Sequence, residues 1–393
     1  MDDQKIPLGW NITAHQKWLL DNKRDAIQEL VSDINKYEKK KPRAIVIQMA
    51  YYLFFISDYQ SCCHILKDSL DSYPDDVEIL QNLSVALSKS GEYAEAILHA
   101  EKVISLDSGN FLVCDSLASS CFRVGALEKA SIYGTKSLIL KDCKYGKIDK
   151  SWKLPKCSPS QFAQGKKKVI SFSLWGNNKR YLFGALRNVL LAPDIYPDWE
   201  LWFHTDDSVP LDFLNLIEKL GGKIIRYPNQ QSLKEKLCWR FSVANAVDVG
   251  YFLVRDIDSV ISVREYNAVQ KWMETEKWFH VIRDWWTHTD LVLAGLWGGV
   301  AGVLPDLDLL LANYKSGNVD TANIDQWFLR DSVWRYIKVS CFIHDRCFSQ
   351  EGSVPLPGVL PQNNIHVGCC EFSQRPDFQE KILAPWIDKL NMD

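Results

Sequence analysis

A period of 34 residues in the front part of the chain constrains its fold more than any other feature. Segments that begin at Ser57, Gly91 and Gly125 recur at this spacing. Ala96 and Ala130 each follow their glycine by five residues, so they keep the same register. A fixed period of this length indicates stacked copies of one small unit, because a single unit cannot bury its own apolar face.

The apolar pattern inside each unit predicts two helices. In the middle unit three leucines fall on one face of a first helix: Leu80, Leu83 and Leu87. Gly91 then makes a tight turn, and the small Ala96 lets a second helix pack closely. This helix pair and its period resemble the tetratricopeptide repeat. We therefore expect an all-α repeat domain over residues 1–145, with a capping helix from Gln16 to Tyr37. Such a domain binds a protein partner, docks on the rest of the chain or mediates dimerisation.

The pattern changes after the repeats. A segment rich in Lys, Pro and Ser predicts a linker over residues 146–166, and residues 167–393 then alternate apolar runs with amphipathic segments. The predicted strands are 169–174, 199–204, 223–227 and 251–255, and the predicted helices between them are 181–191, 211–220 and 237–246. This alternation predicts an α/β, Rossmann-like domain with a mostly parallel sheet. Ligands bind such sheets at the carboxyl ends of the strands.

Composition and charge weigh against several classes of protein. The formal net charge is −3, which gives no electrostatic reason to expect a nucleic-acid partner. The 11 cysteines contain no Cys-x-x-Cys pair, which favours reduced, buried thiols over a disulfide or zinc framework. No apolar run suits a signal peptide or a membrane span, so we expect a cytoplasmic protein without a transmembrane segment.

Two aspartates mark the candidate site. Asp256 and Asp258 directly follow the strand 251–255, so both carboxylates can reach one region beyond the sheet. Hard oxygen ligands of this kind suit Mg²⁺ or Mn²⁺. A second Asp-x-Asp pair, Asp306 and Asp308, precedes a leucine-rich segment, and there we predict a helix N-cap instead.

The order of motifs around the aspartates is similar to that of bacterial nucleotide-sugar glycosyltransferases of the GT-A fold, glycosyltransferase family eight in particular. The resemblance spans residues 168–372. It is carried by Trp239-Arg240-Phe241, Arg255-Asp256-Ile257-Asp258-Ser259, Ile282-Arg283-Asp284, Ala294-Gly295-Leu296-Trp297-Gly298-Gly299, Asp325-Gln326 and His344-Asp345. It implies a GT-A-like catalytic domain that uses a UDP- or GDP-linked nucleotide-sugar donor and Mn²⁺ or Mg²⁺.

The resemblance also implies roles for single residues. Asp256, Asp258 and His344 would hold the metal, with His366 as a rival for the third ligand. For His344 the alternative is a buried histidine without a metal. Asp325 and Gln326 would act at the transferred sugar. The implied donor-binding residues are Ser173, Trp175, Arg180, Arg240, Asp256, Gly295 and Trp297, and the backbone of Gly298 and Gly299 would lie in a loop close to the sugar. Trp285 and Trp286 depart from the related pattern, which has His-Pro at this place. Because aromatic rings can stack on sugars, we expect Trp285, Trp286 and His288 to contact the acceptor, a glycan or a protein, with a donor platform as the alternative for the two tryptophans.

Other functions stay open at this point. The chain is alternatively a non-catalytic scaffold, in which a nucleotide-binding α/β domain without turnover is fused to repeats that bind a protein partner. A metal-dependent phosphohydrolase or nucleotidyltransferase shares the acidic pair, but the chain has no phosphate-cradling, glycine-rich loop typical of one. The sequence decides neither the sugar nor whether its transfer retains or inverts configuration.

Overall fold

The structure, a computed structural model, describes residues 6–37, 40–315, 321–359, 365–374 and 376–387. The chain divides into two compact units, Met1–Leu140 and Lys141–Asp393. Within the described ranges, no helix is both long and apolar enough to cross a membrane.

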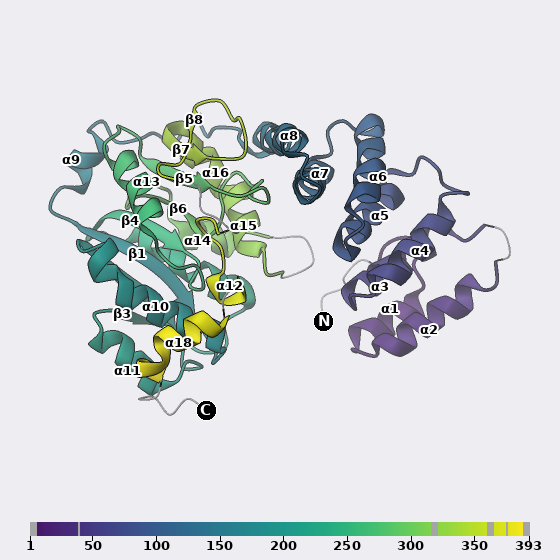
Figure 1. Ribbon diagram of the computed structural model, residues 1–393, viewed down its shortest axis with the longest axis horizontal. Coiled ribbons are helices and arrows are strands. Elements are labelled where there is room, and N and C mark those ends of the chain that lie inside the picture. The colour runs from purple at the N-terminus through teal and green to yellow at the C-terminus, as the bar shows by residue number, and fades with distance from the viewer. Residues whose placement is uncertain (1–5, 38–39, 316–320, 360–364, 375, 388–393) are drawn as a thin grey trace. The chain divides into compact units, whose positions relative to one another are not determined.

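The first unit is a succession of helices in which neighbours along the chain pack together (Figure 1). Their bounds are α1 Ile12–Leu19, α2 Lys23–Ile34, α3 Arg43–Phe55, α4 Tyr59–Ser69, α5 Val77–Ser90, α6 Tyr93–Leu106, α7 Phe111–Arg123 and α8 Leu127–Tyr145. The last turn of α8 belongs to the second unit. The predicted helical repeat is confirmed.

The turns inside the helix pairs follow the predicted period. Ser57, Gly91 and Gly125 lie between the helices of successive pairs, and all three adopt left-handed backbone with φ of 63°, 90° and 78°. Asp76 and Asn110, also 34 residues apart, cap α5 and α7 by accepting backbone N–H groups.

The single capping helix predicted at the N-terminus is wrong. Asp21, with φ of 62°, interrupts it, and α1 and α2 form a further pair.

The second unit is built on an eight-stranded sheet with the order β3-β2-β1-β4-β6-β5-β7-β8 among the described residues. The strands are β1 Lys167–Leu174, β2 Trp199–Thr205, β3 Lys223–Arg226, β4 Val249–Arg255, β5 Phe279–Arg283, β6 Leu296–Val300, β7 Cys341–Asp345 and β8 Ser353–Val354. Of these eight described strands, only β6 runs antiparallel to its two neighbours, β4 and β5. The mostly parallel sheet is therefore confirmed.

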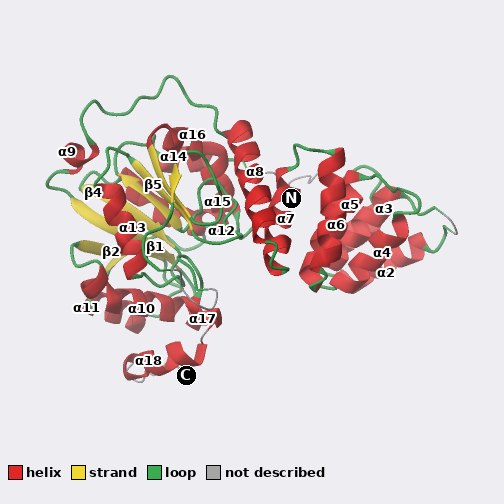
Figure 2. Ribbon diagram, turned by 45° about the horizontal axis from the view of Figure 1, so that its top comes forward, coloured by secondary structure: helices red, strands yellow, loops and turns green. Residues whose placement is uncertain are grey.

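Helices cover the sheet (Figure 2). The α-helices of the second unit are α9 Pro159–Ala163, α10 Lys179–Ile195, α11 Leu211–Lys219, α12 Leu233–Cys238, α13 Val263–Met273, α14 Leu307–Asn313, α15 Ile324–Phe328, α16 Trp334–Ile337, α17 Glu371–Gln374 and α18 Pro376–Ile387. A 3₁₀ helix, η1 Trp239–Asn245, continues α12 and packs on β1 and β4, while α10 packs on β1 and β2.

The predicted elements of the second unit largely match those observed. The four strands and the first two helices are confirmed within a few residues. The third predicted helix, 237–246, is instead the end of α12 followed by η1.

The expected glycine loop is also wrong, because Gly298 and Gly299 lie in the buried strand β6. A Cβ on Gly298 would meet the Phe252 carbonyl at 2.5 Å, so these glycines serve close packing of the sheet.

Candidate functional site

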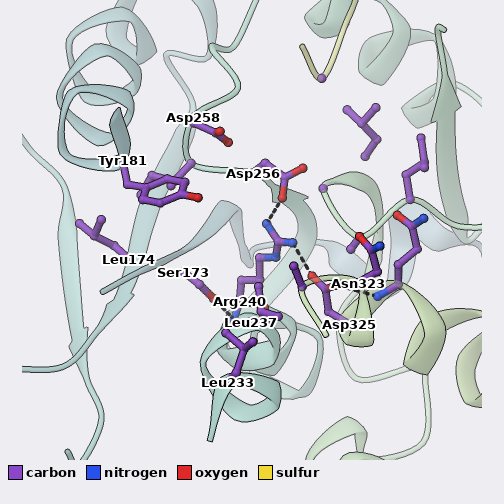
Figure 3. Close-up of a pocket in the computed structure, with 18 of the residues that line it drawn as sticks. Ser173, Leu174, Tyr181, Leu233, Leu237, Arg240, Asp256, Asp258, Asn323 and Asp325 are labelled. Carbon is purple, nitrogen blue, oxygen red and sulfur yellow. Dashed lines mark hydrogen bonds and ion pairs between the residues drawn. The ribbon is translucent and has the colours of Figure 1, made fainter. Parts of the chain in front are cut away.

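A pocket of about 550 Å³ opens where β1 and β4 end, and it gathers most of the predicted site residues (Figure 3). The predicted residues that line it are Ser173, Trp175, Arg180, Arg240, Asp256, Asp258, His288, Gly295, Asp325 and Gln326. They come from β1 and the segment after it, α10, η1, the segment after β4, the segment between β5 and β6, and α15. Residues up to 153 positions apart in the chain therefore meet at the strand ends, as in other parallel sheets.

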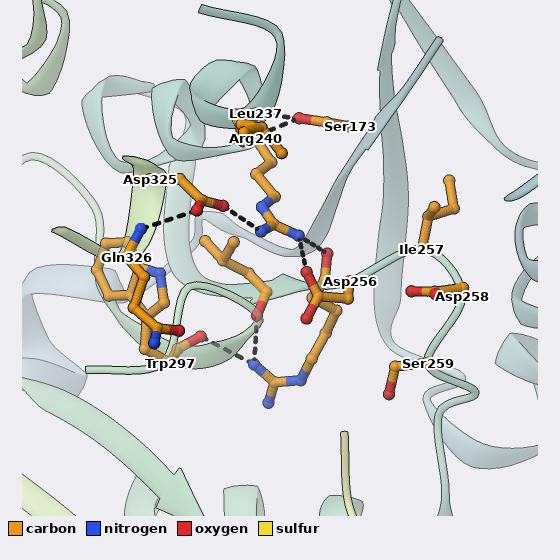
Figure 4. A network of polar contacts seen from close by, with 12 residues as sticks. Ser173, Leu237, Arg240, Asp256, Ile257, Asp258, Ser259, Trp297, Asp325 and Gln326 are labelled. Carbon is orange, nitrogen blue, oxygen red and sulfur yellow. Dashed lines mark hydrogen bonds and ion pairs between the residues drawn. The ribbon is translucent and has the colours of Figure 1, made fainter. Parts of the chain in front are cut away.

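Arg240 is the centre of the polar network in this pocket (Figure 4). Its Nη1 donates to Asp256 Oδ1 at 2.5 Å and to the carbonyl of Arg255 at 2.9 Å. Its Nη2 donates to Asp325 Oδ2 at 2.9 Å. Only 6% of the Arg240 side chain is exposed, so this guanidinium is held on both sides in a site with little water.

Two serines of β1 fix the position of Arg240. Ser171 Oγ donates to the Arg240 carbonyl at 2.8 Å, and Ser173 Oγ accepts from the Arg240 backbone N–H at 3.1 Å. Successive side chains of a strand point to opposite faces, so these two alternate serines both face η1. Ser173 thus lines the pocket and also anchors the helix that carries the arginine.

Asp325 is the buried carboxylate of the network. Burial raises the pKa of Asp325 above its usual range, and Arg240 opposes the shift while Asp256 adds to it. Asp325 Oδ1 also accepts from the backbone N–H of Gln326 at 2.8 Å, in the first turn of α15. The side chain of Gln326 reaches Asp290. A carboxyl group with a raised pKa beside a pocket is suited to accepting a proton or a hydrogen bond.

Asp258 has a different arginine partner. Arg180 Nε donates to Asp258 Oδ2 at 2.7 Å, and Arg180 Nη2 also contacts that oxygen. The segment that carries Asp258 is fixed by α10, because Asn188 Nδ2 donates to the carbonyls of Ile257 and Ser259, each at 3.1 Å. Each aspartate of the pair is thus neutralised by an arginine, which lies 16 residues away for Asp256 and 78 residues away for Asp258.

Glycine is needed at two places around the aspartates. A Cβ on Gly295 would meet Asp256 Oδ2 at 2.1 Å, so the missing side chain makes room for that carboxylate. A Cβ on Gly184 in α10 would meet the Ile257 carbonyl at 2.2 Å, so this glycine lets the aspartate segment lie against the helix. Gly295 was a predicted site residue, whereas Gly184 and Asn188 were missed because their partners lie about 70 residues away.

The donor set of Asp256 and Asp258 fits a hard divalent cation that substrate oxygens and water complete. The arginines engage Oδ1 of Asp256 and Oδ2 of Asp258, and each carboxylate has a second oxygen. Among the described residues, no group of three or more His, Cys, Asp or Glu side chains gathers to form a metal cage. Mg²⁺ binds typically through one or two carboxylates together with substrate phosphates.

The structure does not bring His344 to this site. The imidazole lies on β7, fully enclosed, with its Nδ1 2.7 Å from His280 Nε2 on the adjacent strand β5. The expectation that His344 completes a metal site with the aspartates is therefore not met, because packing inside the sheet layer holds this side chain elsewhere. The rival His366 does not line the pocket either, and its ring stacks on Trp285 at 4.7 Å.

The predicted tryptophans lie outside the pocket lining as well, apart from Trp175. Trp297 is in β6 and fully buried, where it packs edge-on against Phe252 at 5.1 Å, and its carbonyl accepts from Arg255. Because the ring is buried, it cannot contact a nucleotide-sugar donor in the pocket. Trp285 and Trp286 are half-buried in the segment that also carries His288, and of the three only His288 lines the pocket.

Several lining residues were not predicted. Leu233 and Leu237 of α12 form an apolar wall, and Thr287 and Asn323 add polar groups. Asn323 lies two residues before Asp325, and Thr287 lies one before His288, so nearness in sequence to a predicted residue was the available signal. No sequence signal pointed to Leu233 and Leu237, because an apolar face on a helix is typical of any core.

Similarity to known proteins is found among solved structures. No known protein family and no curated protein matches the chain by sequence. Three solved structures that resemble it are MamA from Desulfovibrio magneticus RS-1, the Sgt2 tetratricopeptide-repeat domain from Aspergillus fumigatus, and YrrB, a tetratricopeptide-repeat protein with an unusual peptide-binding site.

These likenesses are limited in extent. MamA is 15% identical over 33% of this chain and 73% of its own, with a TM-score of 0.31. Sgt2 is 18% identical over 24% of this chain and 64% of its own, with a TM-score of 0.24. YrrB is 12% identical over 32% of this chain and 64% of its own, with a TM-score of 0.30. All three are tetratricopeptide-repeat proteins.

Proposed function

We propose that the second unit is a glycosyltransferase that takes a sugar from a UDP- or GDP-linked donor and transfers it to a glycan or protein acceptor. The observation that carries the proposal is the convergence of Asp256, Asp258, Arg240 and Asp325 in one pocket at the strand ends. The order of motifs that resembles glycosyltransferase family eight supports it, since those motifs supply most of the polar lining.

The exposed fractions of Asp256 and Asp325 indicate different roles. Asp256 is 45% exposed and faces the pocket, whereas Asp325 is 5% exposed and bound to Arg240. Arg240 fixes both carboxylates at once and so sets the spacing between the diphosphate end and the sugar end of the pocket. Asp325 would accept a hydrogen bond or a proton from the sugar or the acceptor hydroxyl.

A divalent cation fits the charge of the pocket. Three aspartates and two arginines among the lining residues give a formal charge of −1, which disfavours a diphosphate. Mg²⁺ or Mn²⁺, bound to Asp256 and Asp258, would offset the negative charge that develops on the leaving diphosphate. The polar and aromatic segment from Trp285 to His288 is the candidate acceptor side.

The repeats would recruit a protein, either an acceptor or a partner enzyme. Stacked helix pairs present extended surfaces of the kind that bind proteins. A non-catalytic scaffold is the second candidate function, and the ion pairs on both aspartates favour it to the extent that they lock the pocket. The resemblance in motif order, including Asp325 and Gln326 at the start of α15, favours the enzyme.

Donor turnover tests the proposal. The purified chain is incubated with a panel of UDP- and GDP-sugars and Mn²⁺, and release of the nucleoside diphosphate is measured. We expect Asp256→Asn to lower the rate by about 100-fold, the size of effect seen when a group that stabilises transition-state charge is lost.

The matched control is Asp308→Asn, in the chain's other Asp-x-Asp pair, which belongs to the capped start of α14 and lies outside this pocket. It should keep the wild-type rate. Equal loss in both variants, or nucleotide binding without turnover of any donor, would favour the scaffold.

A further inference from the structure

The two arginines that neutralise the aspartate pair differ in how firmly they are held. Arg240 is 6% exposed and donates to three acceptors, two carboxylates and a backbone carbonyl. Arg180 is 44% exposed, and the carboxylate it contacts is that of Asp258. Arg240 is therefore a fixed part of the pocket, whereas Arg180 can leave its carboxylate at little cost in buried contacts.

Arg180 is also placed to reach a ligand in the pocket. It lies in the first turn of α10, shortly after the end of β1, and it lines the pocket together with Tyr181. Asn178 caps the helix by accepting the Arg180 backbone N–H at 3.0 Å, so the side chain starts from a fixed point. The positive end of a helix dipole favours anions at this place.

A cation on the aspartate pair and the guanidinium of Arg180 compete for the same carboxylate. The contacts of Arg180 use Oδ2 of Asp258, whose side chain is 12% exposed and has little room for both. One bound divalent ion would change the formal charge of the pocket from −1 to +1. The guanidinium displaced from Asp258 would then face a pocket that attracts an anion. A planar, forked donor suits a phosphate group as well as it suits a carboxylate.

We propose that Arg180 is an exchangeable counter-ion. In this structure it occupies the cation position at Asp258, and on binding of a divalent ion it turns from Asp258 to the diphosphate of the donor. The inference rests on the proposed function in that the diphosphate belongs to a nucleotide sugar. Its consequence is positive coupling: the metal raises the affinity for diphosphate, and diphosphate raises the affinity for the metal by the same factor.

Arg180→Gln separates the two roles, because they predict opposite changes. With Mn²⁺ alone, calorimetry should show the variant binding the ion about tenfold more tightly than wild type, since the competing cation is gone. At saturating Mn²⁺, inorganic pyrophosphate should bind the variant about tenfold more weakly, since a charge-assisted hydrogen bond to phosphate is lost.

The control is Arg226→Gln, which removes another exposed arginine paired with an aspartate, Asp207 at 3.3 Å, away from this pocket. It should match wild type in both titrations, and both variants should unfold at the wild-type temperature.

Each of the two changes is required. An unchanged affinity of Arg180→Gln for Mn²⁺ would show that Arg180 does not hold the cation position. An unchanged affinity of Arg180→Gln for pyrophosphate would show that Arg180 does not bind the diphosphate. The absence of pyrophosphate binding to wild type with Mn²⁺ would show the same. If both changes occur and no nucleotide sugar is turned over, the exchange holds and the proposed glycosyl transfer fails, so the two failures are distinguishable.

Discussion

Single side chains decide the chemistry of the pocket through their burial. Arg240 keeps its charge because it lies between Asp256 and Asp325, and removal of either carboxylate would leave a buried charge short of a partner. Asp325 has a raised pKa for the opposite reason, since burial disfavours its ionised form. The charge states of Arg240 and Asp325 therefore depend on the carboxylates and on the burial around them.

His344 provides a test at this scale, because the structure places it in the core, whereas the resemblance implied a metal ligand. Burial lowers the pKa of His344 from 6.5 to about 4. The unfolded chain therefore binds a proton that the folded chain does not, between pH 6.5 and about 4. The stability that the neutral imidazole contributes is complete above pH 6.5 and is lost as the pH falls through this window.

We expect His344→Asn to reduce the loss of unfolding free energy between pH 7 and pH 4 by about 3 kcal/mol, measured by urea unfolding. Asn keeps a polar group near the position of Nδ1, so the contact with His280 has a replacement. Affinity for Mn²⁺ should not change. The control is His64→Asn, since the His64 side chain is 80% exposed. A His344→Asn protein with the wild-type pH slope, or with weakened Mn²⁺ binding, would refute the core assignment.

At the scale of elements, the helix pairs depend on one residue of left-handed backbone in each turn. Gly91 has φ of 90°, and no atom lies within 4 Å of the place that a Cβ would take, so Gly91→Ala introduces backbone strain alone. We expect it to lower the unfolding free energy by about 1 kcal/mol. Ser57 already carries that strain, with φ of 63°, so Ser57→Gly should be neutral or raise stability by up to about 1 kcal/mol.

Gly109→Ala is the control for this pair, because Gly109 has no left-handed φ and its Cβ would meet only Asp107 Oδ1 at 3.6 Å. Thermal or urea unfolding of the four proteins gives the comparison. If Gly109→Ala costs as much as Gly91→Ala, loss of glycine in general matters and the left-handed turn does not.

The same scale shows what could be predicted from the sequence. The turns at Gly91 and Gly125 and the strand before Asp256 were predictable, because a turn glycine and an apolar run are local signals. Gly298 and Gly299 were not, since glycine disfavours strands locally and their place in β6 follows from packing between β4 and β5. The position of His344 beside His280 depends on the pairing of β5 with β7, which no local pattern reveals.

The candidate site follows the same division. Asp256 and Asp258 were found because they end a strand, and Asp325 through the order of motifs that resembles glycosyltransferase family eight. The partnership of Arg180 with Asp258 joins residues 78 positions apart, and that of Arg240 with Asp325 joins residues 85 apart. Such pairings are products of the tertiary fold, so the residues could be named from the sequence but their ion pairs could not.

For the whole molecule, the central claim is that the pocket at the ends of β1 and β4 binds a metal and a nucleotide diphosphate. Anomalous diffraction from crystals of the chain grown with Mn²⁺ and UDP, and in parallel with GDP, tests it most directly. We predict a manganese peak between the carboxylates of Asp256 and Asp258, with the diphosphate beside it and oxygen ligands at about 2.0 to 2.6 Å. A peak beside His344 or His366, or bound nucleotide with no peak at the aspartates, would contradict the claim.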